Sequence, residues 1–185
     1  NSVKRVIYIS STGVYGQTDG SWVNEQSATI PTRPGGIACL KAEQILQQGR
    51  FGERTTVLRL AGIYGPDRIP RLEQIKSGEP MSIPQDGWLN LIHVDDAVTV
   101  VDAVVTQEPK QSCYLVSDGS PVNRGEYLAE IAAILKAPPI TFVSADPNTA
   151  VSQRASGTKR VSHRCLADEF NILWRYPTYR EGLAS

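Results

Sequence analysis

The feature that most constrains the fold of this chain is the alternation of short apolar runs with segments of helical periodicity. The first run is VKRVIYISS at residues 3–11, and TTVLRL at 55–60 and CYLV at 113–116 are similar to it. Near-continuous apolar, β-branched character is typical of strands buried on both faces of a parallel sheet. Residues 36–48 carry apolar side chains at helical spacing, and residues 97–106 follow capping aspartates. Strands that alternate with helices predict an α/β fold with a parallel sheet.

Further elements extend this pattern along the chain. We expect a loop at 16–36, a helix at 69–76, a strand at 89–94, a helix from the cap Asn123 through Lys136, a strand at 140–143 and a helix at 164–170. We place residues 1–65 and 90–118 in a sheet domain. Residues 66–89 and 119–185 would then form a smaller substrate-binding lobe.

The composition excludes several classes of protein. Lys and Arg total 19 and Asp and Glu total 19, so we expect neither a nucleic-acid partner nor an anionic membrane surface. No apolar run reaches the roughly 18 residues of a membrane span. The cysteines Cys39, Cys113 and Cys165 are too widely spaced for a disulfide framework or a zinc site. We therefore expect reduced thiols, a cytoplasmic location and no bound metal.

A glycine-containing turn follows the first predicted strand. It reads TGVYGQTDG, with glycines at positions 13, 16 and 20. A dinucleotide phosphate loop needs a helix to begin inside the glycine run, because the helix N-terminus binds the pyrophosphate. The next residues, SWVNEQSATIPTRP, contain two prolines and have no helical period. We interpret the segment as a turn that leaves a strand, not as a phosphate loop.

Five segments occur in an informative order. They are VIYISSTGVYG, LRLAGIYGP, NLIHVDDAV, CYLVSDGSPV, and TKRVSHRCLADEF with WRYPTYREGL. Together they resemble the extended and atypical short-chain dehydrogenases/reductases of the NAD-dependent epimerase/dehydratase branch. The resemblance implies that the chain is the second half of a Rossmann-type sheet with a smaller C-terminal lobe. We expect the first half, with the phosphate loop for NAD or NADP, upstream of Asn1.

The resemblance also implies a set of catalytic and cofactor-binding residues. The family's active-site Ser falls on Ser11, with Ser10 beside it, and its Lys falls on Lys41. The family's catalytic Tyr lies four residues before the Lys, where this chain has Ile37. Losing a positioned acid/base typically costs on the order of 10² to 10⁴ in rate. Leu60 and Gly62 replace the Pro and Asn that the family commonly places near the nicotinamide.

Other residues are candidates for binding the substrate, each with a simpler alternative. Arg68, Arg71 and Arg160 would hold the diphosphate of a nucleotide sugar, and surface charge is the alternative for each. Thr12 and Tyr15 would line the cleft beside Ser11, and Tyr64 is a further candidate. Packing in the core is the alternative for both tyrosines, and it is favoured for Tyr64. His93 with Asp95 and Asp96 suits a helix cap far better than a metal site.

Two functions remain open at this point. The first is an NAD(P)-dependent epimerase, dehydratase or reductase that acts on a nucleotide sugar or a related hydroxy or keto compound. The second is a protein that binds NAD(P) or senses a ligand on the same fold without catalysis. The retained Ser11 and Lys41 favour the first function, and the missing Tyr favours the second. The resemblance also implies a small-molecule substrate and pairing into a homodimer.

Overall fold

The computed structural model describes residues 3–144, 146, 149 and 157–184. Its central sheet has the strand order β1 (Val6–Ser11), β3 (Thr55–Leu60) and β7 (Cys113–Val116). All three strands are parallel, and Ser11 pairs with Leu60. The sequence prediction of a parallel α/β sheet is therefore confirmed.

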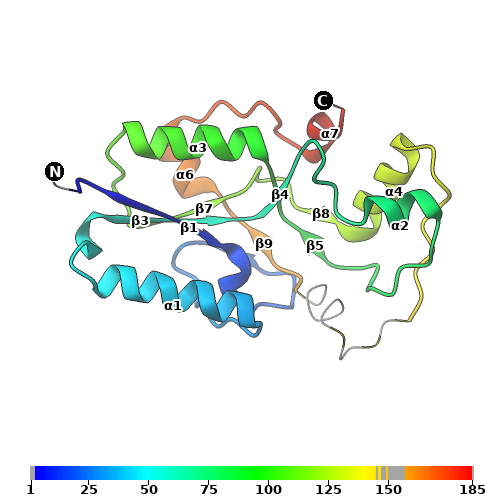
Figure 1. The fold of residues 1–185 in the computed structure, drawn as a ribbon, viewed down its shortest axis with the longest axis horizontal. Helices are drawn as coiled ribbons and strands as arrows, with labels where there is room; N and C mark the ends of the chain where they lie inside the picture. Colours follow the sequence, from blue (N-terminus) through cyan, green and yellow to red (C-terminus); the bar gives the residue numbers. More distant parts are fainter. Residues whose placement is uncertain (1–2, 145, 147–148, 150–156, 185) are drawn as a thin grey trace.

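Helices cover both faces of this sheet (Figure 1). On one face, Leu58 and Val116 pack with Val100 of α3 (Val94–Thr106) and with Leu166 of α6 (Arg164–Phe170). On the other face, α1 (Pro34–Gln48) packs with a short parallel pair, β2 (Trp22–Val23) and β9 (Arg160–Val161). Two single turns join these elements: η1 (Thr12–Val14) lies between β1 and β2, and η2 (Gly52–Arg54) leads from α1 into β3.

The lobe lies to one side of the sheet (Figure 1). It contains α2 (Leu72–Ser77), α4 (Arg124–Ile134), α7 (Tyr179–Leu183) and the antiparallel pair β5 (Trp88–Leu89) and β8 (Val122–Asn123). Its core gathers Ile75, Met81 and Ile131. The parallel pair β4 (Gly62–Tyr64) and β6 (Leu91–His93) connects the lobe to the sheet.

Several predicted bounds match the structure, and others shift. The predicted bounds match for three elements: the strands at 55–60 and 113–116 and the helix at 164–170. Asn123 caps α4 as predicted, because its Oδ1 accepts a hydrogen bond from the Gly125 amide at 2.8 Å. The strand predicted at 140–143 is only a bridge between Met81 and Phe142. The domain boundaries stay a prediction, although α6 from the predicted lobe packs against the sheet.

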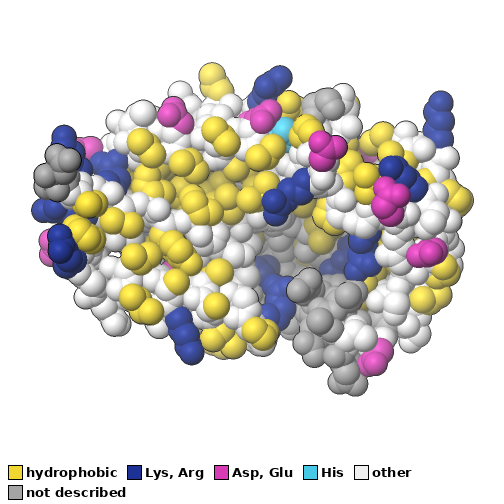
Figure 2. All heavy atoms as spheres, in the orientation of Figure 1, with side chains coloured by type: hydrophobic (Ala, Val, Ile, Leu, Met, Phe, Trp, Pro, Cys, Tyr) yellow, Lys and Arg dark blue, Asp and Glu magenta, His cyan; other side chains and the backbone are white. Residues whose placement is uncertain are grey.

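One edge of the sheet is open in the described part of the chain, because β1 pairs only with β3. Ile9 on this strand is 47% exposed, and Val98 and Val105 on α3 are exposed as well. Figure 2 shows apolar side chains gathered across this face, between the positions of α3 and α1. No helix within the described residues has the length and apolar character needed to cross a membrane.

Candidate functional site

A cavity of about 420 Å³ lies where the carboxyl ends of β1 and β3 meet the lobe. Ligands of open α/β sheets bind at this edge, and the volume suits a small molecule. Figure 2 shows Lys and Arg side chains around the hollow between the sheet and the lobe. The lining residues are Ser11, Thr12, Gly13, Arg33, Ala61, Gly62, Pro70, Arg71, Ile83, Trp88, Leu89, Asn90, Leu91, Arg124, Tyr127, Leu128, Gly157 and Lys159.

Ser11 brings a hydroxyl group to this cavity from the end of β1. Its Oγ accepts a hydrogen bond from the Gly13 amide at 3.0 Å, which fixes the side chain at the start of η1. A Cβ atom added to Gly13 would lie 3.2 Å from Ser11 Oγ and 3.9 Å from Nη2 of Arg33. Gly13 therefore keeps open a small space that a hydroxyl and a guanidinium share.

Lys159 lies just before β9, and its side chain is 7% exposed. Its carbonyl accepts a hydrogen bond from Nδ2 of Asn90 at 2.8 Å, which fixes the backbone. Its ammonium group has no hydrogen-bond or ion-pair partner among the described residues. Burial, with the nearby positive charge of Arg33, lowers the pKa of Lys159 to about 8.

Arg124 and Arg71 line the cavity from the lobe. Arg124 is buried, and its Nη1 donates to the carbonyls of Pro84 at 2.7 Å and Asp86 at 2.5 Å. Burial lowers the pKa of Arg124, and the charge of Arg71 adds to this effect. Arg71 has a positive φ of 62° and donates to Gln74. Together with Arg33 and Lys159, these residues give the described lining four cations and no acidic side chain.

Directly behind Ser11, a buried polar cluster joins α1 to the sheet. Ser10 Oγ donates to Oε1 of Glu43 at 2.5 Å, and Arg59 donates to both Glu43 oxygens, at 3.1 and 2.7 Å. Arg59 also donates to the Tyr15 hydroxyl at 2.6 Å, which in turn donates to the Asn24 carbonyl. Burial raises the pKa of Tyr15 to about 12 even though Arg59 lowers it, so this phenol stays protonated.

Comparison with known proteins identifies the fold and the family. The model of the NAD dependent epimerase/dehydratase family matches residues 1–116. The chain belongs to this family. It is 28% identical to Protein YeeZ of Escherichia coli (strain K12) over 141 residues, which are 76% of this chain and 49% of YeeZ.

Two solved structures are similar to this chain in fold. One is a conserved protein of unknown function from Silicibacter pomeroyi DSS, with a TM-score of 0.85, 31% identity and coverage of 98% of this chain and 65% of that one. The other is MoeE5 in complex with UDP-glucose and NAD, with a TM-score of 0.76, 26% identity and coverage of 98% and 63%. The chain therefore spans about half of YeeZ and somewhat less than two thirds of the two chains of known structure.

The epimerase/dehydratase fold brings four of the predicted site residues to the cavity: Ser11, Thr12, Gly62 and Arg71. Ser10 and Leu60 do not line it. The Ser10 hydroxyl is committed to Glu43, and Leu60 packs into the core beneath α3. Tyr15 also lies outside the lining, in the cluster behind Ser11.

Lys41 and Ile37, which the resemblance predicts at the positions of the family's Lys and Tyr, lie on the exposed side of α1. The buried side of this helix carries Gly36 and Glu43, seven residues apart on one face. The carboxylate of Glu43 points inward because Arg59 and Ser10 hold it there. The structure thus does not place Lys41 beside Ser11, and the predicted cofactor contact of Lys41 stays a prediction.

Arg68 and Arg160 lie outside the cavity lining. Arg68 is exposed and donates to the Ile63 carbonyl. Arg160 donates to the Gly20 carbonyl at 2.8 Å, and its guanidinium lies over the rings of Trp22 and Trp88. The prediction that these two arginines bind substrate is therefore not supported by this cavity. Sequence reasoning missed Arg33, Arg124 and Lys159, although Lys159 lies in the segment TKRVSHRCLADEF that carries part of the resemblance.

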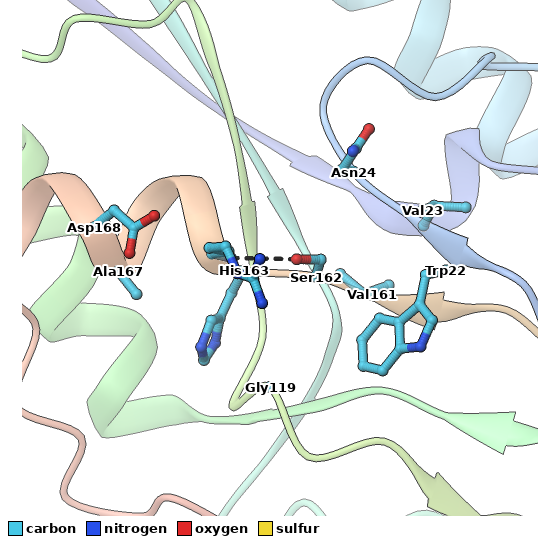
Figure 3. Close-up of a pocket in the computed structure, with 10 residues that line it drawn as sticks. Trp22, Val23, Asn24, Gly119, Val161, Ser162, His163, Ala167 and Asp168 are labelled. Atoms are coloured by element: carbon cyan, nitrogen blue, oxygen red, sulfur yellow. Dashed lines mark hydrogen bonds between the residues drawn. The ribbon is translucent and has the colours of Figure 1, made fainter.

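A second cavity, of about 590 Å³, lies beside β9 and the start of α6 (Figure 3). His163 is its most reactive side chain, but its Nδ1 lies 2.6 Å from the Ser117 carbonyl and its ring stacks on Trp174. His93 likewise has a structural role, because its Nδ1 caps α3 by accepting from the Asp95 amide at 3.2 Å. Within the described residues, no group of His, Cys, Asp and Glu is placed to hold a metal ion.

Proposed function

We propose that the whole protein is an NAD(P)-dependent oxidoreductase that acts on an anionic hydroxy or keto compound of the nucleotide-sugar kind. The observation that carries the proposal is the charge of the cavity, whose described lining combines four cations with no acidic side chain. Guanidinium groups match the geometry of phosphate oxygens, and Arg71 and Arg124 lie together at the lobe side. MoeE5, which this chain resembles, was solved with UDP-glucose and NAD.

The residues at the sheet edge fit the nicotinamide end of such a cofactor. A nicotinamide supplies or accepts a hydride, and the protein contributes binding and orientation. The Ser11 hydroxyl faces the cavity, and Gly62 beside it carries no side chain. The turn at Gly13 leads into β2 and not into a helix, so it does not provide a phosphate site. We place the phosphate loop for NAD or NADP upstream of Asn1.

A binding experiment tests the proposed substrate class. In the full natural protein, Arg71→Ala should weaken the binding of UDP-glucose or UDP-glucuronic acid by 10-fold or more in isothermal titration calorimetry. The reason is that a charge-assisted hydrogen bond contributes about 1.5–3 kcal/mol. Arg68→Ala is the matched control, since Arg68 is a nearby arginine outside the cavity. Equal effects of the two substitutions would contradict the proposal.

The second candidate function is ligand binding without catalysis, which the exposed Ile37 favours. The absorbance of NADH or NADPH, followed while the protein is incubated with cofactor and sugar, separates the two functions. Turnover of a bound sugar supports the oxidoreductase, whereas tight binding of cofactor and sugar without turnover supports the binding protein. A cytoplasmic location and pairing into a homodimer remain predictions from the sequence.

A further inference from the structure

The proposed reaction requires a group that exchanges a proton with the substrate oxygen, and the tyrosines near the cavity do not provide it. Position 37, where the family has its Tyr, is an exposed Ile. The Tyr15 hydroxyl is engaged by Arg59 and Asn24 outside the cavity. Tyr127 lines the cavity, but its hydroxyl oxygen is buried away from the open space, and burial raises its pKa to about 12.

Lys159 differs from the other lysines of this chain in its surroundings. It lines the same cavity as Ser11, and more than nine tenths of its side chain is buried. A buried ammonium normally has a carboxylate partner, because an unpaired charge is costly to desolvate. Lys159 has no such partner among the described residues, and the sequence outside them contains no Asp or Glu. Lys159 is therefore a residue of the cavity lining whose ammonium group has no counter-ion among the described residues.

We propose that Lys159 is the acid/base of the reaction and exchanges a proton with the substrate oxygen that Ser11 binds. This proposal rests on the proposed function. In the oxidation direction, the neutral amine of Lys159 takes the proton of the substrate hydroxyl. The carbon that bears this hydroxyl gives a hydride to an oxidised nicotinamide. The O–H and C–H bonds break, the C=O bond forms, and the amine becomes ammonium. In the reduction direction, the ammonium returns the proton to the oxygen.

The charges around Lys159 suit this exchange. Arg33 faces it from the segment before α1, and Arg71 and Arg124 line the cavity from the lobe. The described lining contributes no Asp, Glu or His. Burial and Arg33 lower the pKa of Lys159 to about 8, so the amine and the ammonium are both populated near neutral pH. A group with such a pKa can accept and donate protons in one catalytic cycle.

The first test measures the titration of Lys159 directly and does not depend on turnover. The chain contains six lysines, and the full protein labelled with 13C at lysine Cε should give one NMR signal for each lysine in this chain. Lys159→Arg identifies the signal, and Lys41→Arg is the matched control at an exposed position of the same chain. We expect a midpoint near pH 8 for Lys159, well below the pKa of about 10.4 that a lysine has in a model peptide. Arg33→Gln should raise the Lys159 midpoint. A midpoint near pH 10 for Lys159 would overturn the proposal whatever the substrate is.

The second test separates proton exchange from simple charge. Lys159→Arg keeps the positive charge but cannot release a proton near neutral pH. We expect it to bind UDP-glucose or UDP-glucuronic acid within a few-fold of the wild type and to lose on the order of 10²-fold or more in kcat. An unchanged kcat, or a loss confined to KM, would assign Lys159 to anion binding and overturn the acid/base role. Failure of the sugars to bind wild-type protein instead refutes the proposed substrate class, and the NMR midpoint then still decides whether Lys159 can exchange protons. Circular dichroism of each variant verifies folding.

Discussion

At the scale of single residues, the surroundings of Asp118 raise the pKa of its carboxyl group. Asp118 follows β7, its Oδ1 accepts a hydrogen bond from the Ser120 amide at 2.9 Å, and its Oδ2 is buried with no partner among the described residues. Burial, together with the charge of Asp96, raises the pKa of Asp118 to about 7. In the unfolded chain, the pKa of an Asp is about 3.9.

This difference predicts that folding stability depends on pH. Between about pH 4 and pH 7 the folded state holds a proton that the unfolded state has lost, so stability falls as pH rises through this window. Asp118→Asn keeps the acceptor for Ser120 and should remove the fall, which makes the variant more stable than the wild type at pH 8. Urea denaturation at pH 5, 6, 7 and 8 measures the effect. The exposed Asp102→Asn is the control, and parallel pH profiles of Asp118→Asn and the wild type would contradict the assignment.

At the scale of elements, the contact between α1 and the sheet depends on the ion pair of Glu43 with Arg59. Both side chains are almost fully buried, and the Nη2–Oε2 distance is 2.7 Å. Removing one partner of a buried pair leaves an uncompensated charge, which typically costs about 3–5 kcal/mol. The pair therefore determines which face of α1 points inward.

Glu43→Ala should accordingly reduce the free energy of unfolding by about 3–5 kcal/mol. Replacing both partners by apolar residues, Glu43→Leu with Arg59→Met, should recover much of this loss because no buried charge is left. Urea denaturation measures both variants. Glu73→Ala, which breaks the exposed pair with Lys76, is the control and should change stability far less. A loss for Glu43→Ala no larger than that of the control would refute the role of the pair.

The elements themselves were predictable from local patterns, whereas the site was predictable only in part. Continuous apolar runs place β3 and β7 correctly, because burial on both faces leaves a clear signal in the sequence. The direction in which a side chain points depends on partners that are distant in the sequence. The sequence predicts Arg160 as a site residue, but its guanidinium lies over the rings of Trp22 and Trp88, and its neighbour Lys159 lines the cavity instead. Four separate segments supply the cations of the cavity, and no local spacing could reveal that they meet.

At the scale of the whole molecule, the open edge of β1 predicts how the 185-residue chain behaves in isolation. An exposed edge strand offers unpaired backbone groups to other chains, and Ile9 adds apolar surface there. We expect the isolated chain to self-associate, which light scattering measures as an increase in mass. Ile9→Lys should reduce this self-association. Leu173→Lys, at an exposed residue outside the sheet, is the control. A monodisperse monomer at high concentration would contradict the prediction.

The parallel order of β1, β3 and β7 also has a kinetic consequence. Val6 pairs with Thr55 and Val57 pairs with Cys113, so each strand waits for a partner about 50 residues further along the chain. Such non-local pairings slow folding, because the entropy of closing a long loop is lost before the contacts form. During synthesis, β1 therefore leaves the ribosome well before β3 does. The chain therefore passes through an interval in which β1 lacks β3, its partner in the described sheet, and its apolar residues stay available for other contacts.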